Sequence, residues 1–246
     1  MKKITIFAML LFLIINLSII VSAADTISEG FVKEKDGRIK GKFVHYLDNN
    51  NFLIKQNTPS QIQDNCYSPL AAHWLETPIE YVINPSNPQN LSERFITKSI
   101  SKSAESWDKK TGIDLFSNSY LINYTLIPGS PDYINTIGFL NYSNPSIIAV
   151  TYMWFDSNLT QMIEFDQIYN TLSNWGDATK NDSVMDLQNV ATHEFGHAIG
   201  LDHISTPECI SSTMYPYTFV GETSKRTLED GDIQGLRYLY NWTQKI

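Results

Sequence analysis

The sequence predicts an α+β fold, and three observations indicate that class. Apolar residues recur at helical spacing near residue 100, a long stretch rich in short strands follows, and two more helical segments come after it. No internal repeat is evident in the 246 residues. We expect one domain over residues 66–246, about 180 residues long, which is an ordinary domain size.

The first residues are typical of an export signal. Two lysines precede an apolar run from Ile4 to Val21, and small residues follow it. A basic start, an apolar middle and small residues for cleavage predict a signal peptide over residues 1–23, and hence a secreted, extracellular protein. The alternative is an uncleaved N-terminal membrane anchor with the rest of the chain facing outside, because the apolar run is nearly long enough to span a bilayer.

The charge of the chain excludes some partners. The formal net charge is -8, and it becomes -10 once Lys2 and Lys3 leave with the signal peptide. An acidic chain without a Lys/Arg cluster argues against binding to nucleic acid and against a stable association with anionic lipid. We expect a monomer.

Residues 24–65 are polar and carry only short apolar patches such as Phe43-Val44. They are interpreted as an N-terminal extension or a pro-segment, and both alternatives stay open. Residues 77–85 then alternate like a strand bounded by prolines, so we expect this strand to open the sheet of the main domain.

A helix backing the sheet is predicted next. Asn90 and Glu93 look like the ends of a capping box, and apolar residues at helical spacing continue until Gly112. From residue 113 to 171 the chain turns β-rich. Strands are expected over 120–127, 134–140, 147–155 and 162–169, separated by turns rich in Pro, Gly, Asn and Ser.

The segment 191–203 carries the chemistry. A capping box from Ser183 to Asp186 predicts the start of a helix on which His193 and His197 stand four residues apart, so both lie on one face and can hold one cation. Gly200 allows the backbone to leave the helix in a left-handed conformation, which turns His203 back toward the same ion.

Three neutral histidines are a ligand set for one catalytic Zn²⁺, which makes a bound water acidic and polarises a carbonyl. Glu194 lies one step round the helix and can reach such a water, so it is the candidate general base and proton shuttle. The chemistry indicated is metal-assisted hydrolysis without a covalent intermediate.

This spacing of histidines, Glu194 and Gly200 resembles the zinc signature of the metzincin metallopeptidases. Residues 211–217 look like the Met-turn of that family, which implies that Met214 forms an apolar floor beneath the zinc. The residues of both motifs are most similar to those of the matrixin group, the matrix metalloproteinase-like enzymes. Two positions depart from it: Ile204 stands where matrixins typically carry Ser, and Thr218 stands in place of a Tyr in the wall of their specificity pocket.

The resemblance implies a metzincin-like catalytic domain with a twisted mixed β-sheet, a backing helix, an active-site helix, the Met-turn and a C-terminal helix beginning near Thr227. It also places residues 147–155 at the edge of the sheet above the active-site cleft. An edge strand can bind an extended polypeptide substrate by main-chain hydrogen bonds, with Val150, Thr151, Tyr152 and Met153 as candidate contacts. The alternative is an ordinary buried strand without substrate contact.

Two cysteines in an exported chain suggest one disulfide, Cys66 to Cys209. The alternative is that Cys66 is a zymogen thiol that caps the zinc, although its surroundings do not resemble the matrixin switch sequence.

The histidines outside the motif, His45 and His73, are expected to be surface or satisfied residues, and a second, structural zinc is not expected. Calcium is left open, since Asp156 and Asn158 form too loose a ligand pattern to assign.

The expected function is that of a secreted zinc endopeptidase. Two other classes are kept: a zinc hydrolase of non-protein esters or amides, and a secreted non-catalytic binding protein with structural zinc.

Overall fold

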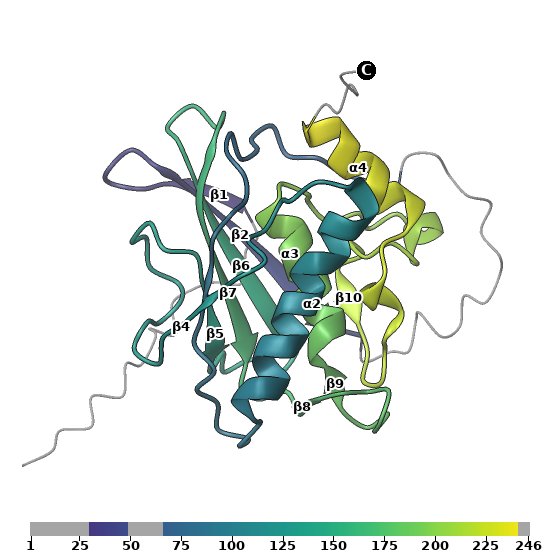
Figure 1. Cartoon of the computed structure of the whole chain (residues 1–246). Coiled ribbons are helices and arrows are strands. Elements are labelled where there is room, and N and C mark those ends of the chain that lie inside the picture. Colours follow the sequence, from purple (N-terminus) through teal and green to yellow (C-terminus); the bar gives the residue numbers. More distant parts are fainter. Residues whose placement is uncertain (1–29, 49–65, 241–246) are drawn as a thin grey trace, which may run out of the picture.

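The computed structural model of the chain describes residues 30–48 and 66–240 (Figure 1). The predicted signal peptide, residues 1–23, lies outside the described residues. Within those two ranges, no helix combines the length and the apolar character needed to cross a bilayer.

One mixed sheet carries the fold, with helices packed on one of its faces (Figure 1). Its strand order is β1-β2-β6-β7-β5-β3-β4, and β10 pairs with β2. Strands β4, β3, β5 and β7 run parallel, whereas β6 is antiparallel to its neighbours β7 and β2. The predicted α+β class with a mixed sheet is therefore confirmed. The strands are β1 Gly30–Lys33, β2 Ile39–Leu47, β3 Val82–Ile83, β4 Leu121–Ile122, β5 Thr136–Leu140, β6 Ile147–Phe155, β7 Met162–Asn170 and β10 Tyr217–Thr218; β8 Trp175–Gly176 and β9 Met185–Asp186 form a separate pair.

The strand expected over residues 120–127 is much shorter than predicted. Only β4, Leu121–Ile122, pairs with the sheet. The Asn123 side chain accepts hydrogen bonds from the backbone N–H groups of Thr125 and Leu126, at 2.8 and 3.3 Å, and so turns the chain away. A local turn made by an Asn side chain overrides the β propensity of the residues around it.

Residues 30–47 are part of the sheet, although the sequence separates them from the main domain. β2 pairs with β6 along nearly its whole length, from Ile39 against Phe155 to Tyr46 against Ile147. In the full chain, residues 147–155 are therefore not an edge strand as predicted, because β2 covers that edge. Val150, Thr151, Tyr152 and Met153 lie in a strand that is paired on both sides and buried throughout. The strand expected to open the sheet, residues 77–85, contributes β3 between β4 and β5.

The backing helix α2 spans Glu93–Thr111. Its N-cap is Ser92, whose side chain accepts from the Phe95 N–H, so the capping box predicted from Asn90 is displaced by two residues. Gly112 ends the helix with φ of 71°, a left-handed conformation that suits glycine. The apolar face of α2 is buried, and Trp107 donates its indole N–H to Thr192 O of α3 at 2.9 Å.

Helix α3, Leu187–Ala198, is the predicted motif helix. Asp186 rather than Ser183 is its N-cap, accepting from the Asn189 N–H at 2.8 Å. Arg226, from the short helix η2 Ser224–Arg226, in turn pairs with Asp186. The face expected to pack beneath the sheet is buried as predicted: Leu187, Val190, Ala191 and Ala198. The C-terminal helix α4 spans Asp230–Tyr240, and the helix η1 spans Pro207–Cys209.

Candidate metal centre

The three motif histidines converge in the structure. His193 and His197 lie on one face of α3, and Gly200, with φ of 100°, carries the chain back so that His203 meets them. The Nε2 atoms of the three rings lie 3.1 Å from one another in each pair. All three nitrogens therefore point at one common centre.

Backbone carbonyls fix the orientation of two of these rings. His193 Nδ1 lies 2.6 Å from Thr213 O, and His197 Nδ1 lies 2.8 Å from Leu201 O. A carbonyl oxygen can only accept, so each Nδ1 carries the proton and donates it. Each Nε2 then presents a lone pair to the centre, which is how a neutral histidine binds a metal ion.

This arrangement fits a cation. The three Nε2 atoms lie 3.1 Å apart, and their lone pairs repel one another. A positive ion between the nitrogens removes that repulsion. A tetrahedral zinc ion with Zn–N bonds of about 2.0–2.1 Å keeps its ligand nitrogens roughly 3.3 Å apart. The spacing in the protein is close to that value, so His193, His197 and His203 could hold zinc with little movement.

Burial favours the neutral, ligating form of these rings. Desolvation, followed by the nearby histidines, lowers the pKa of His193 well below its usual value. Desolvation and then His203 do the same for the pKa of His197, whose hydrogen bond to Leu201 opposes the shift. Both rings are completely buried.

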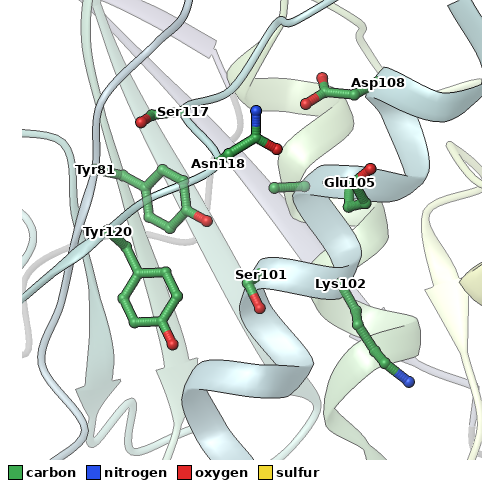
Figure 2. A pocket seen from close by; sticks show the side chains of 9 residues that line it. Tyr81, Ser101, Lys102, Glu105, Asp108, Ser117, Asn118 and Tyr120 are labelled. Atoms are coloured by element: carbon green, nitrogen blue, oxygen red, sulfur yellow. The ribbon is translucent and has the colours of Figure 1, made fainter.

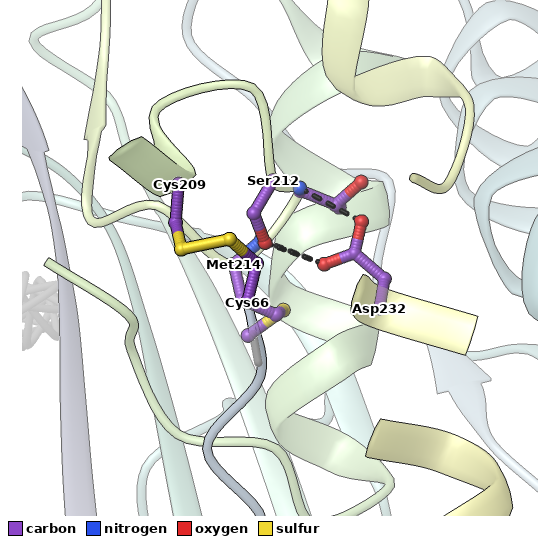
Figure 3. The surroundings of a disulfide bond; sticks show 6 residues. Cys66, Cys209, Ser212, Met214 and Asp232 are labelled. Carbon is purple, nitrogen blue, oxygen red and sulfur yellow. Dashed lines mark hydrogen bonds between the residues drawn. A yellow bond between two sulfur atoms is a disulfide. The ribbon is translucent and has the colours of Figure 1, made fainter. Parts of the chain in front are cut away.

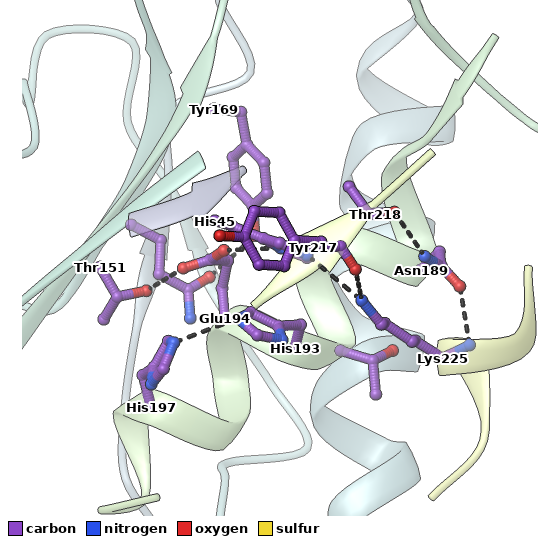
Figure 4. Close-up of polar contacts among 12 residues, drawn as sticks. His45, Thr151, Tyr169, Asn189, His193, Glu194, His197, Tyr217, Thr218 and Lys225 are labelled. Atoms are coloured by element: carbon purple, nitrogen blue, oxygen red, sulfur yellow. Dashed lines mark hydrogen bonds and ion pairs between the residues drawn. The ribbon is translucent and has the colours of Figure 1, made fainter. Parts of the chain in front are cut away.

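Glu194 lies beside the centre, held by a side chain of the sheet. Its Oε2 accepts a hydrogen bond from Thr151 Oγ1 of β6 at 2.5 Å, and its Oε1 lies 3.3 Å from Nδ1 of His45 (Figure 4). The carboxylate is fully buried. Thr151 thus contacts the site from a strand whose edge β2 covers in the full chain.

His45 is a residue of the site that the sequence analysis missed. It was expected to be a surface or satisfied residue, yet it is completely buried and stacks on His193, with ring centroids 3.8 Å apart. Phe43, two residues earlier on the same face of β2, stacks on His197 with centroids 4.6 Å apart. Alternation could not have revealed His45, because Val44 between Phe43 and His45 is apolar and completely buried as well.

The predicted Met-turn lies under α3. Met214 is buried and packs against Gly196, where an added Cβ would clash with the Met214 sulfur and lie 2.8 Å from the Trp107 ring. The turn is anchored by Asp232 of α4, which accepts from Ser212 Oγ at 2.7 Å and from the Thr213 N–H at 2.9 Å (Figure 3).

Cys66 and Cys209 form a disulfide with Cα atoms 5.3 Å apart, close to this turn (Figure 3). In this arrangement Cys66 is not a free thiol over the histidines, as the alternative required.

His73 forms a bridge with Gln161 and lies edge-on to Tyr240, away from the cluster. Asp156 accepts from Thr160 and Gln161, and its role as a calcium ligand stays a prediction.

A cavity of about 190 Å³ lies elsewhere, between α2 and the segment that leads to β4 (Figure 2). Asp108 lines it, and burial raises the pKa of its carboxyl to about 7. The same carboxylate accepts from the N–H groups of Leu115 and Phe116, at 3.0 and 3.3 Å. Asp108 therefore has a structural role, holding the chain after α2.

Comparison with known proteins agrees with this geometry. Residues 143–241, less than half of the chain, match the matrixin family model, and this range contains the histidine cluster, Glu194 and Met214. Over these residues the chain is similar to the matrixins, a group of the metzincins. The matched range does not include β1 and β2, the two strands of the N-terminal segment.

The curated proteins that match part of the chain include matrix metalloproteinases. Matrix metalloproteinase-9 of the dog is 45% identical over 51 residues, which are 21% of this chain and 6% of the relative. Human matrix metalloproteinase-25 is 38% identical over 78 residues, 32% of this chain and 14% of the relative. Rat matrix metalloproteinase-16 is 38% identical over 72 residues, 29% of this chain and 11% of the relative. The chain thus matches a small part of the length of these relatives.

Proposed function

We propose that the protein is a secreted zinc-dependent endopeptidase. The observation that carries the proposal is the triangle of three Nε2 atoms beside a buried carboxylate, Glu194. The similarity to matrixins over residues 143–241 supports the same chemistry. His193, His197 and His203 would hold the ion, which when bound supplies Lewis acidity to water and to a peptide carbonyl.

Glu194 has the position of a general base. It is adjacent to His193 in the chain, and Thr151 orients its carboxylate by a hydrogen bond to Oε2. Oε1 is left facing the space that His45 enters, where Glu194 can take a proton from water and later give it to the leaving amine. The carbonyls of Thr213 and Leu201 keep the His193 and His197 rings in the ligating tautomer.

The substrate proposed is an extended polypeptide that pairs with β6. β2 supports this, because it already makes that pairing and lies over the cluster with Phe43 and His45. A substrate cannot pair with the same edge of β6 while β2 is there. Residues 24–65 are therefore proposed to be a pro-segment whose strand β2 blocks the site.

Bound zinc and proteolysis of the purified chain test this function. Wild type and Glu194→Gln are each analysed for zinc and incubated with a denatured protein, before and after a cut engineered within residues 49–65. We expect one zinc in both proteins and cleavage by the cut wild type alone. Loss of zinc from Glu194→Gln would assign the carboxylate to the ligand set instead, and a cut wild type that holds zinc without cleaving would contradict the peptidase function.

A further inference from the structure

The side chain of His45 is completely buried, and we call the space that it fills the His45 pocket. The backbone around it is fixed on two sides: β2 pairs with β6, and the Tyr46 and Asp48 N–H groups donate to Pro216 O and Thr218 O at 3.0 and 2.7 Å. The His45 ring is buried between the His193 ring, the Glu194 carboxylate and the ammonium of Lys225 (Figure 4).

Lys225 is the unusual member of this pocket, because a completely buried lysine needs hydrogen-bond partners. Its ammonium donates to Tyr215 O at 3.0 Å and to Tyr217 O, and it lies 3.4 Å from Nε2 of His45. Glu222 Oε2, 3.9 Å away, balances its charge. An ammonium has three protons, so two go to carbonyls of the pocket wall and the third faces whatever side chain fills the pocket.

We propose that Lys225 determines the specificity of this pocket, by selecting a residue whose side chain ends in a hydrogen-bond acceptor at the place of His45 Nε2. This inference deepens the proposed function. It rests on that function, because a substrate residue enters the pocket only if the chain cleaves peptides. Glutamine, glutamate and histidine carry an acceptor about that far from the backbone. Leucine or methionine would leave a buried ammonium proton without a partner, which is costly.

Aspartate is the discriminating case. Its shorter side chain would place the carboxylate near Glu194, whose Oε1 lies by the inner nitrogen of His45, whereas Lys225 lies by the outer one. The aspartate and Glu194 carboxylates would repel each other, so aspartate is expected to be rejected although it bears the same charge as glutamate. The pocket therefore reads the position of an acceptor as well as its presence.

Because His45 fills the pocket in the full chain, substitutions at position 45 test which side chains the pocket accepts. We would measure hydrogen exchange at the Tyr46 and Asp48 amides in His45→Gln and His45→Leu, each with Lys225 and with Lys225→Met. With Lys225, exchange in His45→Leu should be about tenfold faster than in His45→Gln, the factor expected for one unmet buried donor. With Lys225→Met the two should agree within about threefold.

Phe43→Leu is the matched control. It alters the same face of β2 at its contact with His197, and its effect on exchange should be equal in the two Lys225 backgrounds. Equal exchange of His45→Leu and His45→Gln with Lys225 present would overturn the proposal, as would a difference that survives Lys225→Met. If Lys225→Met does not fold, the series Gln, Leu and Asp at position 45 in the Lys225 background still decides, since faster exchange for Leu and Asp than for Gln is required.

Substrate profiling of the zinc-loaded chain, cut within residues 49–65 after folding, extends the test to cleavage. Peptides that vary at one position should be cut about tenfold faster with Gln, Glu or His there than with Leu or Asp. Cleavage without such a preference overturns the pocket proposal and leaves the peptidase function standing. Coupling between positions 45 and 225 without cleavage of any peptide supports the pocket and contradicts the peptidase function.

Discussion

Glu194 takes its environment from three separate elements. Helix α3 supplies the residue, β6 supplies the Thr151 hydroxyl that binds Oε2, and β2 places His45 against Oε1. Such a carboxylate is positioned by neighbours that are distant in the sequence. A substitution of Glu194 therefore also changes its contacts with Thr151 and His45.

Gly196 is required by close packing inside the motif. A methyl group at this position would meet the Met214 sulfur and the Trp107 ring, both buried. We expect Gly196→Ala to lower the free energy of unfolding by about 1–3 kcal/mol, the usual cost of overpacking a core. Thermal or urea unfolding measures it, with Gly138→Ala as the control, because a methyl at Gly138 would be 3.4 Å from its nearest neighbour. An equally stable Gly196→Ala would show that Met214 moves aside freely.

Asp108 makes stability depend on pH. Burial raises the pKa of its carboxyl from 3.8 to about 7 in the folded chain, so the folded state binds the proton more tightly than the unfolded state. The stability that this proton contributes is complete below about pH 4 and is lost as pH rises toward 7.

Asp108→Asn keeps an acceptor for Leu115 and Phe116 and removes the charge. We expect it to be more stable than wild type at pH 8, by about 1–2 kcal/mol after allowance for partial exposure, and no more stable at pH 4. Urea unfolding at both pH values is the measurement. A difference that is the same at the two pH values would exclude titration of Asp108 as its cause.

At the scale of elements, β2 is the strand to which the proposed function gives a blocking role. It is held by β6 on one side and by β1 and β10 on the other. The N–H of Tyr46 donates to Pro216 O at 3.0 Å. Proline has no N–H, so Tyr46→Pro removes this bond and disturbs the strand.

We expect Tyr46→Pro to raise cleavage of a denatured protein at least about tenfold in the zinc-loaded full chain, because loosening β2 exposes β6. Hydrogen exchange of residues 39–47 should become faster at the same time. Tyr46→Phe keeps the N–H and serves as the control. Rapid exchange of β2 without any rise in cleavage would argue against its role as a blocking strand.

At the scale of the whole molecule, Cys66 and Cys209 join segments 143 residues apart. This link connects the start of the main domain to the loop between His203 and the Met-turn. In the chain-entropy model, closing so long a loop stabilises the folded state by roughly 4–5 kcal/mol.

The double variant Cys66→Ser, Cys209→Ser should therefore unfold at a clearly lower temperature, with a loss of roughly 2–5 kcal/mol. Calorimetry of the oxidised wild type, the reduced wild type and the variant would measure it. The reduced wild type should behave like the variant. If reduction has no effect while the variant is destabilised, packing of the cysteines rather than the link would be responsible.

The sequence alone determined the parts of this protein that depend on local geometry. Two histidines four residues apart share a helix face wherever the helix lies, and Gly200 permits the left-handed exit that brings in His203. Periodicity likewise predicted α2 and β6, whose residues 147–155 are found as expected. Helix starts were placed less well, since several residues near each end can act as the N-cap.

Only the tertiary structure decided which strand lies beside β6 and what fills the space over the cluster. Pairing of β2 with β6 joins residues more than 100 positions apart, and no local pattern specifies such a partner. His45 of β2 and Lys225 of η2 are 180 positions apart in the sequence and meet only in the tertiary structure. A pocket is a property of distant side chains brought together, so the sequence predicted the metal ligands and the structure alone identified the residues that surround them.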